Sequence, residues 1–592
     1  MKYSFPILFI FFLRASGSSQ ELMKNEQVWQ AGSFIQKSVK IQDQSKLIKE
    51  SQKTSGTIPL RDGWPVKVGL LPTYPVVADL TKDGFKELVI SDHYGYLHVF
   101  TADGEYLSEK YPIQLGDMLS TPAIADVDQD GELEIIVVEC FAFGDYFPNG
   151  RVHVLNINGE HLSGWPYELD GGHGRINSVS IGDINNDDIL NIITATGVSV
   201  GIGGDTIVYH NKIYAFNPDG TLLPGWPIEP SDAYEKKMIP RSPLVLADLD
   251  QDGFLEIISG FYYSPDPNGS RNGIFALNHD GTIVSGFPIR NEDWNYALAS
   301  ADMDNDGVYE IYSMARRYNR YGYHDPTWNM NRLGGHKLAF ADVNQDGYPE
   351  IIYGSDKVYV VDKDGDLLPG WPQDTRSGGD IIDGNPVAGD IDGDGDIEIL
   401  IGSHYTNKIF AWHHDGRPVA GFPVTTGGSN SRIAISDLDG DGDIELISAC
   451  EDSMVYVWDI PATGPCEKME WPIYQRDQYR TGTYPSKHGT SVIEEPGKAA
   501  RSFRLEQNYP NPFNPSTEIR FVLPKASKVN LSVYNTLGQQ IRILASGFMP
   551  SGSHTAVWDG RDEQGSLVPS GVYVCRLRAE GEVVTRKLTL MR

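Results

Sequence analysis

Short hydrophobic runs alternate with acidic, glycine-containing loops through most of this chain. Residues 386–389 and 398–403 form one such pair of runs, followed by a third run at 408–413 and an edge segment near Pro423. Runs of this length, separated by turn residues, are typical of β-strands rather than helices. The pattern therefore predicts a unit of four short antiparallel strands.

The acidic loop between the first two runs recurs eight times as a variant of Asp-x-Asp-x-Asp-Gly-x-x-Glu. The copies start 40 to 65 residues apart, at Asp79, Asp126, Asp183, Asp248, Asp302, Asp342, Asp390 and Asp437. This spacing is close to the length of one four-stranded propeller blade. We therefore predict an all-β chain that contains an eight-bladed β-propeller.

A second signal follows most of the acidic loops. It consists of Asp-Gly and then Gly-Trp-Pro or Gly-Phe-Pro, as at Asp364, Gly365 and Trp371. Asp-Gly favours a hairpin turn, and the aromatic-Pro step opens the next extended segment. The fifth copy lacks this ending after Glu310. A seven-bladed ring and an open solenoid of hairpins are therefore alternatives to eight blades.

The N-terminal residues have the features of a secretory signal peptide. Lys2 is followed by a short apolar run and then by small residues, which predicts a signal peptide at 1–19. A polar arm without clear β alternation is expected at 20–62, and the propeller at 63–484. We expect residues 471–484 to close the ring against Trp64, Pro65 and Val66. The mature chain is expected to have no transmembrane segment, since no other apolar run is long enough.

Beyond the propeller, a linker is expected at 485–502, where Ser, Gly, Lys and Glu are frequent. From residue 503 the pattern changes to alternating strands such as 518–523 and 528–534. These strands predict a small Ig-like β-sandwich at 503–592.

Charge and cysteine content narrow the functional classes. The formal net charge of -31 over 592 residues argues against nucleic acid as a partner, because phosphates need clustered Lys and Arg. The four cysteines show no Cys-x-x-Cys spacing that would indicate zinc or thiol redox chemistry. Cys450 and Cys466 are either a disulfide or two separate thiols.

The spacing of the acidic residues predicts calcium sites. Alternate positions in a tightly turning loop direct oxygen ligands to one point, and glycine at the sixth position lets the backbone fold over the ion. The absence of His and Cys from these positions disfavours zinc and copper. The predicted ligands are Asp79, Thr81, Asp83, Glu87; Asp126, Asp128, Asp130, Glu134; Asp183, Asn185, Asp187; Asp248, Asp250, Asp252, Glu256; Asp302, Asp304, Asp306, Glu310; Asp342, Asn344, Asp346, Glu350; Asp390, Asp392, Asp394, Glu398; Asp437, Asp439, Asp441, Glu445.

The eight copies differ in their ligand sets. Thr81 and Asn344 each replace a carboxylate and should weaken their sites. The third copy has Asp188 in place of glycine and Asn191 in place of glutamate, so we expect it to bind most weakly. These repeats resemble the FG-GAP/VCBS-type propeller family. The resemblance implies structural calcium and a binding or adhesive role without a shared catalytic apparatus.

A ligand-binding face is predicted opposite the acidic loops. There the turns of copies two to five, at 141–149, 197–210, 261–271 and 316–332, are expanded and rich in aromatic residues. Aromatic rings beside arginines commonly hold sugars or extended peptides. The predicted ligand residues are Tyr262, Tyr263, Arg316, Arg317, Tyr318, Tyr321 and Trp328. The alternative is that these turns are long hairpins that pack on each other.

No catalytic motif is present: there is no Gly-x-Ser-x-Gly, His-Glu-x-x-His or phosphate-binding loop. The chain is therefore predicted not to be an enzyme. A polysaccharide lyase is the alternative, since some rhamnogalacturonan lyases are calcium-loaded propellers. Its candidate histidines are His173, His324 and His336.

The C-terminal segment carries its own short motifs. Residues 508–515 read Asn-Tyr-Pro-Asn-Pro-Phe-Asn-Pro, followed by Trp558-Asp-Gly and by Pro-Ser-Gly-Val-Tyr at 569–573. Together they resemble the type A sorting domain of the type IX secretion system. The resemblance implies the type IX secretion machinery as a partner and a Gram-negative source. It also implies that the protein is secreted or held at the outer-membrane surface, where a glycan or protein ligand is expected.

Overall fold

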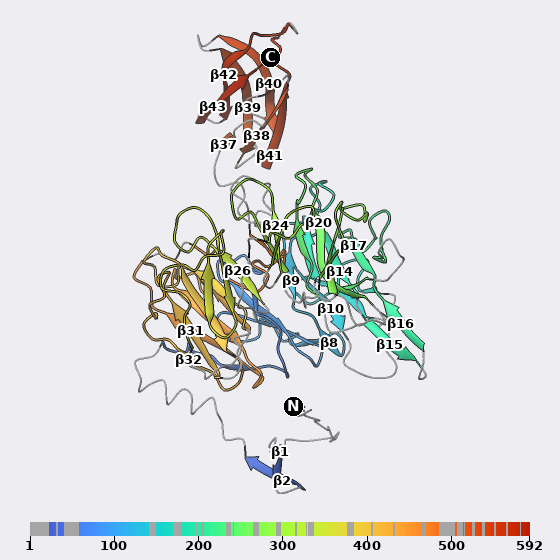
Figure 1. The fold of residues 1–592 in the computed structure, drawn as a ribbon, viewed down its shortest axis with the longest axis vertical. Coiled ribbons are helices and arrows are strands. Elements are labelled where there is room, and N and C mark those ends of the chain that lie inside the picture. Colours follow the sequence, from blue (N-terminus) through green and yellow to red (C-terminus); the bar gives the residue numbers. More distant parts are fainter. Residues whose placement is uncertain are drawn as a thin grey trace. The chain divides into compact units, whose positions relative to one another are not determined.

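Eight sheets of mainly antiparallel strands follow one another between residues 66 and 484 in the computed structural model of the chain (Figure 1). The described residues contain no helix, and therefore none that could cross a membrane. The chain divides into two compact units, residues 1–490 and 491–592. The structure describes residues 23–30, 33–40, 58–140, 150–169, 179–196, 198–202, 206–231, 238–240, 242–263, 272–291, 298–313, 316–326, 328, 337–375, 384–403, 406–429, 432–464, 466, 468–484, 504–505, 513, 516–523, 527–535, 539–549, 552–563, 566–579 and 582–591.

Each of the eight sheets is one blade of a propeller. The first four blades contain β4 (Val76–Ala78), β5 (Glu87–Ser91), β6 (Tyr96–Phe100) and β7 (Ile113–Gln114); β8 (Met118–Leu119), β9 (Ala123–Ala125), β10 (Glu134–Cys140), β11 (Arg151–Leu155) and β12 (Tyr167–Glu168); β13 (Val179–Gly182), β14 (Asn191–Ala195) and β17 (Ile213–Phe216); β18 (Met238–Pro240), β19 (Val245–Ala247), β20 (Glu256–Tyr263), β21 (Asn272–Leu277) and β22 (Ile289–Asn291).

The last four blades contain β23 (Leu298–Ala301), β24 (Glu310–Ser313), β25 (Arg316–Tyr318) and β36 (Thr483–Tyr484); β26 (Leu338–Ala341), β27 (Glu350–Gly354) and β28 (Val358–Val361); β29 (Val387–Gly389), β30 (Glu398–Ser403), β31 (Lys408–Trp412) and β32 (Val424–Thr425); β33 (Arg432–Ser436), β34 (Ile444–Ala449), β35 (Met454–Ile460) and β3 (Val66–Lys67). The eight-bladed prediction is therefore confirmed over the seven-bladed alternative.

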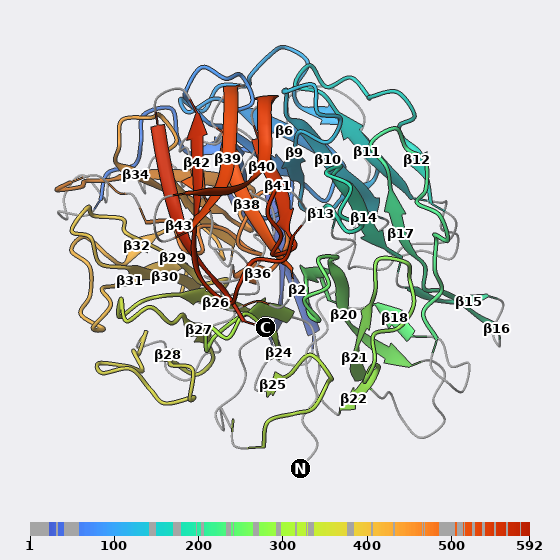
Figure 2. The same ribbon diagram turned by 90° about the horizontal axis from the view of Figure 1, so that it is seen from above.

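The blades follow chain order around a ring. Their innermost strands contact one another in the sequence β4, β9, β13, β19, β23, β26, β29 and β33. Figure 2 looks onto this ring, and its colours run round it from blue near β6 through green at β21 to orange at β31. Because each blade is covered on both faces by its neighbours, the second strands are largely buried; all six residues of β34 are buried, for example.

The ring closes through the N-terminal end of the propeller. β3 pairs with β35, with Val66 opposite Val455, so residues from the two ends of the propeller share the eighth blade. The sequence analysis expected residues 471–484 to be the partner of this segment, and that expectation is wrong. Residues 58–62, which were assigned to the polar arm, also belong to this blade, since Leu60 bridges to Trp458.

Residues 471–484 instead form an axial segment that contacts the innermost part of every blade. Backbone amides of the innermost strands donate hydrogen bonds to its carbonyls in six blades: Ile124 to Gln478 (2.9 Å), Ile181 to Tyr479 (2.9 Å), Leu246 to Thr481 (3.0 Å), Ser300 to Gly482 (3.1 Å), Ala388 to Trp471 (3.0 Å) and Ile435 to Pro472 (3.0 Å).

The other two blades touch the axial segment through aromatic rings. Tyr74, just before β4, stacks on Tyr474 with 4.1 Å between ring centroids, and Phe340 of β26 lies 5.6 Å from Trp471. The axial segment therefore gives the inner edges of the ring a shared hydrogen-bonding partner.

Where the aromatic residue of the second repeat signal is tryptophan, its side chain joins one blade to the next. Trp165, Trp226 and Trp371 donate their indole N–H to the carbonyls of Pro218, His279 and His414 in the following blade, at 2.8, 3.2 and 3.0 Å. Seven of these aromatic-Pro peptide bonds are cis. In the fifth blade, Trp328 takes the same place, because its N–H bonds back to Asp325 as that of Trp371 bonds back to Leu368. The irregular fifth copy is thus a variant of the repeat.

Before the propeller lie two paired strands, β1 (Met23–Gln30) and β2 (Ser33–Lys40). The sequence analysis found no clear β alternation here, so the hairpin corrects that expectation. The pairing is local and continuous from Met23 opposite Lys40 to Gln30 opposite Ser33.

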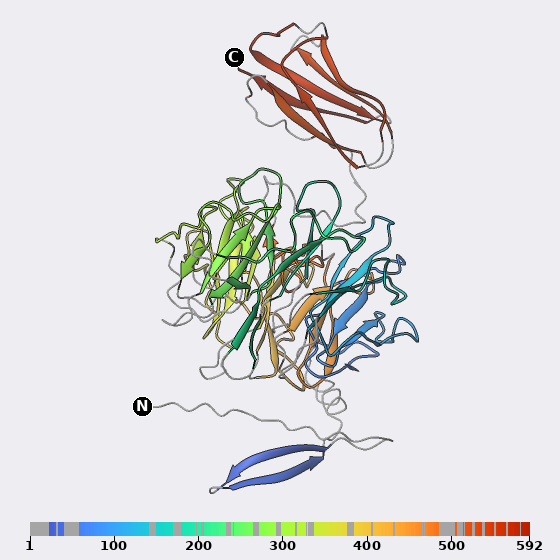
Figure 3. The same ribbon diagram turned by 90° about the vertical axis from the view of Figure 1, so that its right-hand side faces the viewer.

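The C-terminal unit is a two-layered β-sandwich (Figure 3). One sheet contains β37 (Arg504–Leu505), β38 (Thr517–Leu523) and β41 (Gly552–Trp558), and the other β39 (Ser527–Asn535), β40 (Gln540–Met549), β42 (Gly571–Ala579) and β43 (Glu582–Leu590). Alternate residues of β42, including Tyr573, Cys575 and Leu577, point into the core. Trp558 is fully buried there, and its indole N–H donates to the Arg561 carbonyl.

We predict that Trp471→Ala destabilises the whole propeller, because Trp471 is 1% exposed and packs against the axis. Loss of a buried tryptophan side chain should cost about 3–5 kcal/mol. Urea unfolding followed by circular dichroism measures this as a lower midpoint. The control is Tyr94→Ala, since Tyr94 is 48% exposed. Equal midpoints for the two variants would contradict the assigned role of the axial segment.

Candidate metal centres in the acidic loops

All eight acidic loops connect the innermost strand of a blade to its second strand. In blade seven, for example, the loop lies between β29 and β30. Because this connection is the same in every blade, the loops emerge on one face of the propeller. The loops therefore recur as one structural device around the ring.

Three hydrogen bonds shape each loop. The ninth residue accepts from the backbone N–H of the second, as Glu256 does from Leu249 at 2.7 Å. In six copies the first aspartate accepts from the sixth residue, as Asp126 does from Gly131 at 3.1 Å. In the last two copies it accepts from the fourth residue instead. The fifth residue accepts from the seventh in all eight copies. These bonds turn the carboxylates inward.

The backbone makes this turn at two positions. The sixth residue is glycine in seven copies, with φ near +90°, as for Gly131 and Gly253. The fourth residue is also left-handed, for example Gln251 at φ 64° and Asn305 at φ 55°. Asparagine tolerates this conformation, whereas other non-glycine residues adopt it at a cost. The turn at the sixth position was predicted from the sequence, whereas the left-handed backbone at the fourth position was not.

Five loops bring three or more ligand atoms within 4.8 Å of one another: Asp126, Asp128 and Glu134; Asp248, Asp250 and Glu256; Asp302, Asp304 and Asp306; Asp392, Asp394, Glu398 and His413; Asp437, Asp439 and Asp441. Among the described residues, the first, third and sixth loops do not form such a group. These three are the copies to which the sequence analysis assigned weaker ligand sets, and their relative affinities stay predictions.

Side-chain amides explain why two of these three loops do not form a group of ligand atoms. In the sixth loop, the Asn344 side chain donates to Glu350 Oε1 at 3.0 Å. In the third loop, the Asn185 side chain donates to Asp187 Oδ2 at 2.9 Å, and Asn191 takes the place of the ninth glutamate as acceptor from Ile184. An amide donor directed at a carboxylate uses an oxygen that a cation would otherwise bind.

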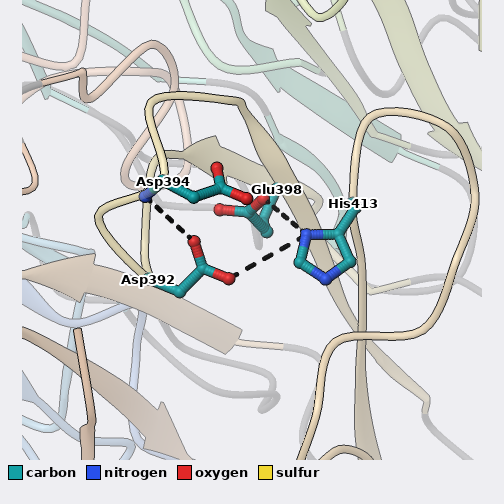
Figure 4. A group of neighbouring side chains, drawn as sticks. All are labelled: Asp392, Asp394, Glu398 and His413. Atoms are coloured by element: carbon teal, nitrogen blue, oxygen red, sulfur yellow. Dashed lines mark hydrogen bonds and ion pairs between the residues drawn. The ribbon is translucent and has the colours of Figure 1, made fainter. Parts of the chain in front are cut away.

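The seventh loop has an additional member, His413, that the predicted ligand set does not include. His413 Nδ1 lies 3.0 Å from Glu398 Oε1 and 3.9 Å from Asp392 Oδ2 (Figure 4). His413 follows β31, which is paired to β30 so that His413 comes opposite Glu398. Only the strand register, and no local spacing, could have indicated this neighbour.

Burial raises the pKa of the ninth-position glutamates, and the neighbouring aspartates add to the effect. The pKa rises to about 7 for Glu87, to about 8 for Glu134 and to about 9 for Glu398. The cause is that a buried carboxylate loses hydration and faces like charge. A bound cation would remove both penalties.

The residues of these loops fit a divalent cation. In the second loop, Asp126 Oδ1 is buried and has no hydrogen-bond partner among the described residues. Asp128 and Glu134 supply further carboxylate oxygens next to it. An oxygen-only set of this kind suits a hard ion such as calcium.

Neighbouring loops are also joined to one another. The amide side chains of Gln251, Asn305 and Gln345, each at the fourth position, donate to the carbonyls of Gly307, Gly347 and Gly395 at the sixth position of the next loop, at 2.7, 2.7 and 2.8 Å. Gln129 likewise donates to the Asp188 carbonyl. These contacts cross blade boundaries, so hydrogen bonds join the loops of blades two and three and the loops of blades four to seven.

The predicted ligand-binding residues do not form one wall opposite the loops. In the fifth blade, Arg316–Tyr318 is the third strand, β25, and not a turn. Residues 319–322 form the turn after it, on the side of the acidic loops, where Arg320 donates to the Asp250 carbonyl at 3.3 Å. The error arose because the fifth copy lacks the Asp-Gly that marks this turn elsewhere.

Two of these residues are buried in the core. Tyr318 and Trp328 are each 2% exposed, so neither ring is open to a ligand. Arg317 is paired with Asp325 and lies over Trp328, 5.1 Å from the ring centroid. Arg316 is half-buried, whereas Tyr321 is 45% exposed.

The rest of the predicted wall is only partly described. Tyr262 and Tyr263 end β20, and their side chains lie outside the described residues, as do residues 141–149 and 264–271. In the third blade, β15 (Val198–Ile202) and β16 (Thr206–His210) form a separate two-stranded hairpin. Of the candidate catalytic histidines, His173 and His336 lie outside the described residues and His324 is exposed. Cys450 and Cys466 are free thiols in the structure.

Two family models match parts of the chain. Residues 342–401 and 390–448 match the FG-GAP-like repeat, and residues 514–582 match the FlgD Ig-like domain. The chain therefore contains FG-GAP-like repeats followed by an Ig-like domain. The comparison with curated proteins found no match.

Solved structures similar to the chain include two rhamnogalacturonan lyases and a secretion component. Lyase YesW is 16% identical, with 75% of this chain and 82% of that chain covered and a TM-score of 0.45. The exotype lyase YesX is 17% identical, with the same coverages and a TM-score of 0.44. PorZ, a surface component of the type IX secretion system of Porphyromonas gingivalis, is 10% identical over 88% of this chain and 82% of that chain, with a TM-score of 0.20.

The two lyases correct one prediction of the sequence analysis. The absence of familiar catalytic motifs led to the prediction that the chain is not an enzyme, and the presence of lyases among similar structures overturns it. Motif searches of this kind detect only catalytic groups with a fixed local spacing, whereas a propeller gathers residues from separate blades.

We predict that the second and third loops differ in ion content. Glu134→Gln should lower the number of bound divalent ions by one per chain, because it removes a carboxylate from a complete set. Asn185→Ala in the third loop should leave the number unchanged. Elemental analysis of dialysed protein gives both counts. An equal loss in the two variants would contradict the inequality of the loops.

Proposed function

We propose that the chain is an exported, calcium-stabilised propeller that binds a glycan or protein ligand outside the cell. The observation that carries the proposal is the row of inward-turned carboxylates on one face, held alike in successive blades. Calcium is the cation that we assign, because the donors are hard oxygens from a flexible acidic loop with glycine at its turn.

Calcium would act here on the stability of the fold. Without a cation, several carboxylates repel one another within each loop, and the ninth glutamate is buried at 2% exposure or less in loops such as those of Glu134 and Glu256. Ion binding removes this repulsion only in the folded loop, so its free energy adds to the free energy of unfolding.

Exposed aromatic residues of the fifth blade support a ligand-binding role. Tyr321 and Tyr323 are 45% and 72% exposed on the side of the acidic loops. The Arg320 guanidinium lies 4.7 Å from the Tyr321 ring centroid, which fixes that ring at the surface. Exposed rings beside a guanidinium suit the apolar face and hydroxyl groups of a sugar. We therefore favour a polysaccharide over a protein as the ligand.

The C-terminal sandwich supports export by a type IX system. Its motifs at Trp558 and at residues 569–573 lie at strand ends of an Ig-like sandwich that could fold as its own unit. Under this proposal the sandwich delivers the propeller to the cell surface or the medium, where calcium is plentiful.

We predict calcium-dependent binding to polysaccharides. The intact protein should bind at least one member of a panel of pectic and other bacterial or plant polysaccharides, and Tyr321→Ala with Tyr323→Ala should weaken this binding about tenfold or more, as expected for loss of two stacked rings. Tyr94→Ala is the control. Chelator should lower both the melting temperature and the binding.

The same incubations assign the class of the protein. Unsaturated products in the polysaccharide reactions would identify the lyase alternative, whereas retention of polysaccharide without new chain ends would identify a binding module. An unchanged melting temperature in excess chelator would contradict the proposed role of calcium.

We predict that removal of residues 503–592 stops export. In a Gram-negative host with a type IX system, the truncated propeller should accumulate inside the cell envelope, because the signal peptide alone carries it only across the inner membrane. Immunoblots of cell and medium fractions measure the distribution. Release of the truncated protein at the level of the full chain would exclude the sandwich as a sorting domain.

A further inference from the structure

In the eighth loop, a guanidinium of the chain itself lies among the acidic side chains. Arg61 Nη2 is 2.6 Å from Asp439 Oδ2, and Arg61 Nη1 is 3.7 Å from Glu445 Oε1 and 3.0 Å from Asp459 Oδ1. Asp439 and Glu445 are the third and ninth residues of the loop. The positive charge therefore contacts two of the residues that the sequence analysis assigned to a calcium ion.

The other blades show what Arg61 replaces. In each blade, a residue three or four positions before the repeated aromatic residue donates its backbone N–H to the third strand. These residues are Leu107, Leu162, Leu223, Val284, Asp325, Leu368 and Val419, and in the eighth blade Arg61, which donates to the Val457 carbonyl. Six of the seven counterparts are apolar, so none of those six can neutralise its own acidic loop.

The only acidic counterpart, Asp325, is also part of an ion pair, but with a different partner. It pairs with Arg317 of its own blade. Among the described residues, the eighth blade is therefore the one whose residue at this position forms an ion pair with its own acidic loop.

The fold holds Arg61 firmly in this place. Its neighbour Leu60 bridges to Trp458, and the indole N–H of Trp64 donates to the Ala102 carbonyl at 3.0 Å. Arg61 Nε donates to the same carbonyl at 3.2 Å. The side chain is only 15% exposed. The guanidinium is therefore positioned from both sides and does not move freely at the surface.

We propose that the eighth loop is not a calcium site and that Arg61 supplies its cation. Asp437, Asp439 and Asp441 do lie close together, but an oxygen of Asp439 is already hydrogen-bonded to the guanidinium, and a divalent ion would be repelled by the charge beside it. The ion pair also fastens the strand that closes the ring to the last blade, so this closure needs no metal.

The first test is the number of bound calcium ions, and it rests on the proposed calcium role. In Arg61→Leu, which carries the residue that other blades have, the count should rise by one ion per chain. In the protein that keeps Arg61, the double variant Asp437→Asn with Asp441→Asn should leave the calcium count unchanged. The matched double variant in loop seven, Asp390→Asn with Asp394→Asn, should lower the calcium count by one. A lower count for the loop-eight pair, or an unchanged count for Arg61→Leu, would overturn the proposal.

The second test compares melting temperatures, first without calcium and then with it. In excess chelator, Arg61→Leu should melt at least about 2 °C below the unchanged protein. Arg417→Leu is the control, because Arg417 is largely exposed and its ion pair among the described residues is with Asp415. Calcium should raise the melting temperature of Arg61→Leu more than that of the unchanged protein. Equal melting temperatures in chelator would overturn the proposal. If the loop-seven pair leaves the ion count unchanged, the proposed calcium role fails, and this second test still decides the role of Arg61.

Discussion

The innermost strand of each propeller blade has an edge that no other strand of its own repeat covers. Backbone amides at such an edge cost free energy if they are buried without a partner, so a ring of eight blades must satisfy them together. Residues 471–484 do this by accepting hydrogen bonds from Ile124, Ile181, Leu246 and their counterparts in three more blades. The packing of the blades and the placement of their loops both depend on this axial segment.

Away from the axis, both repeated sequence signals form hydrogen bonds between neighbouring blades. The aromatic residue of one blade donates to the turn of the next, as Trp226 does to the His279 carbonyl. The fourth residue of an acidic loop donates to the loop of the next blade, as Gln251 does to the Gly307 carbonyl. The repeat is therefore as much a device for joining blades as for building them. Ion binding in one loop would be felt by its neighbour through these contacts.

Sequence patterns predicted the features that depend on local spacing. The eight acidic loops, the strands on either side of them and the turn positions of the sandwich follow from residues close together in the chain. Features that depend on distant pairing could not be predicted. Val66 finds Val455 through a two-residue strand, and His413 meets Glu398 through strand register, so neither contact has a local signature.

The errors at the fifth blade have a related cause. Its turn keeps the hydrogen bond from the Gly322 N–H to the Asn319 carbonyl, which matches that from Gly365 to Asp362 in the next blade, but Tyr321 replaces the aspartate of the usual Asp-Gly signal. Because that signal is missing, the sequence pattern predicted a turn where strand β25 lies. For the same reason it placed Trp328, which is buried, on a ligand-binding surface. Similarly, Arg61 could not be linked to the eighth loop, because the two are separated by almost the entire propeller sequence.

The position of the axial segment in the chain also limits when the ring can be completed. Residues 471–484 follow the last repeat of the propeller in the sequence. Without this segment, the six backbone amides that donate to it cannot make those hydrogen bonds. A copy of the chain interrupted anywhere before residue 471 therefore lacks the contacts that hold the inner edges of the blades together.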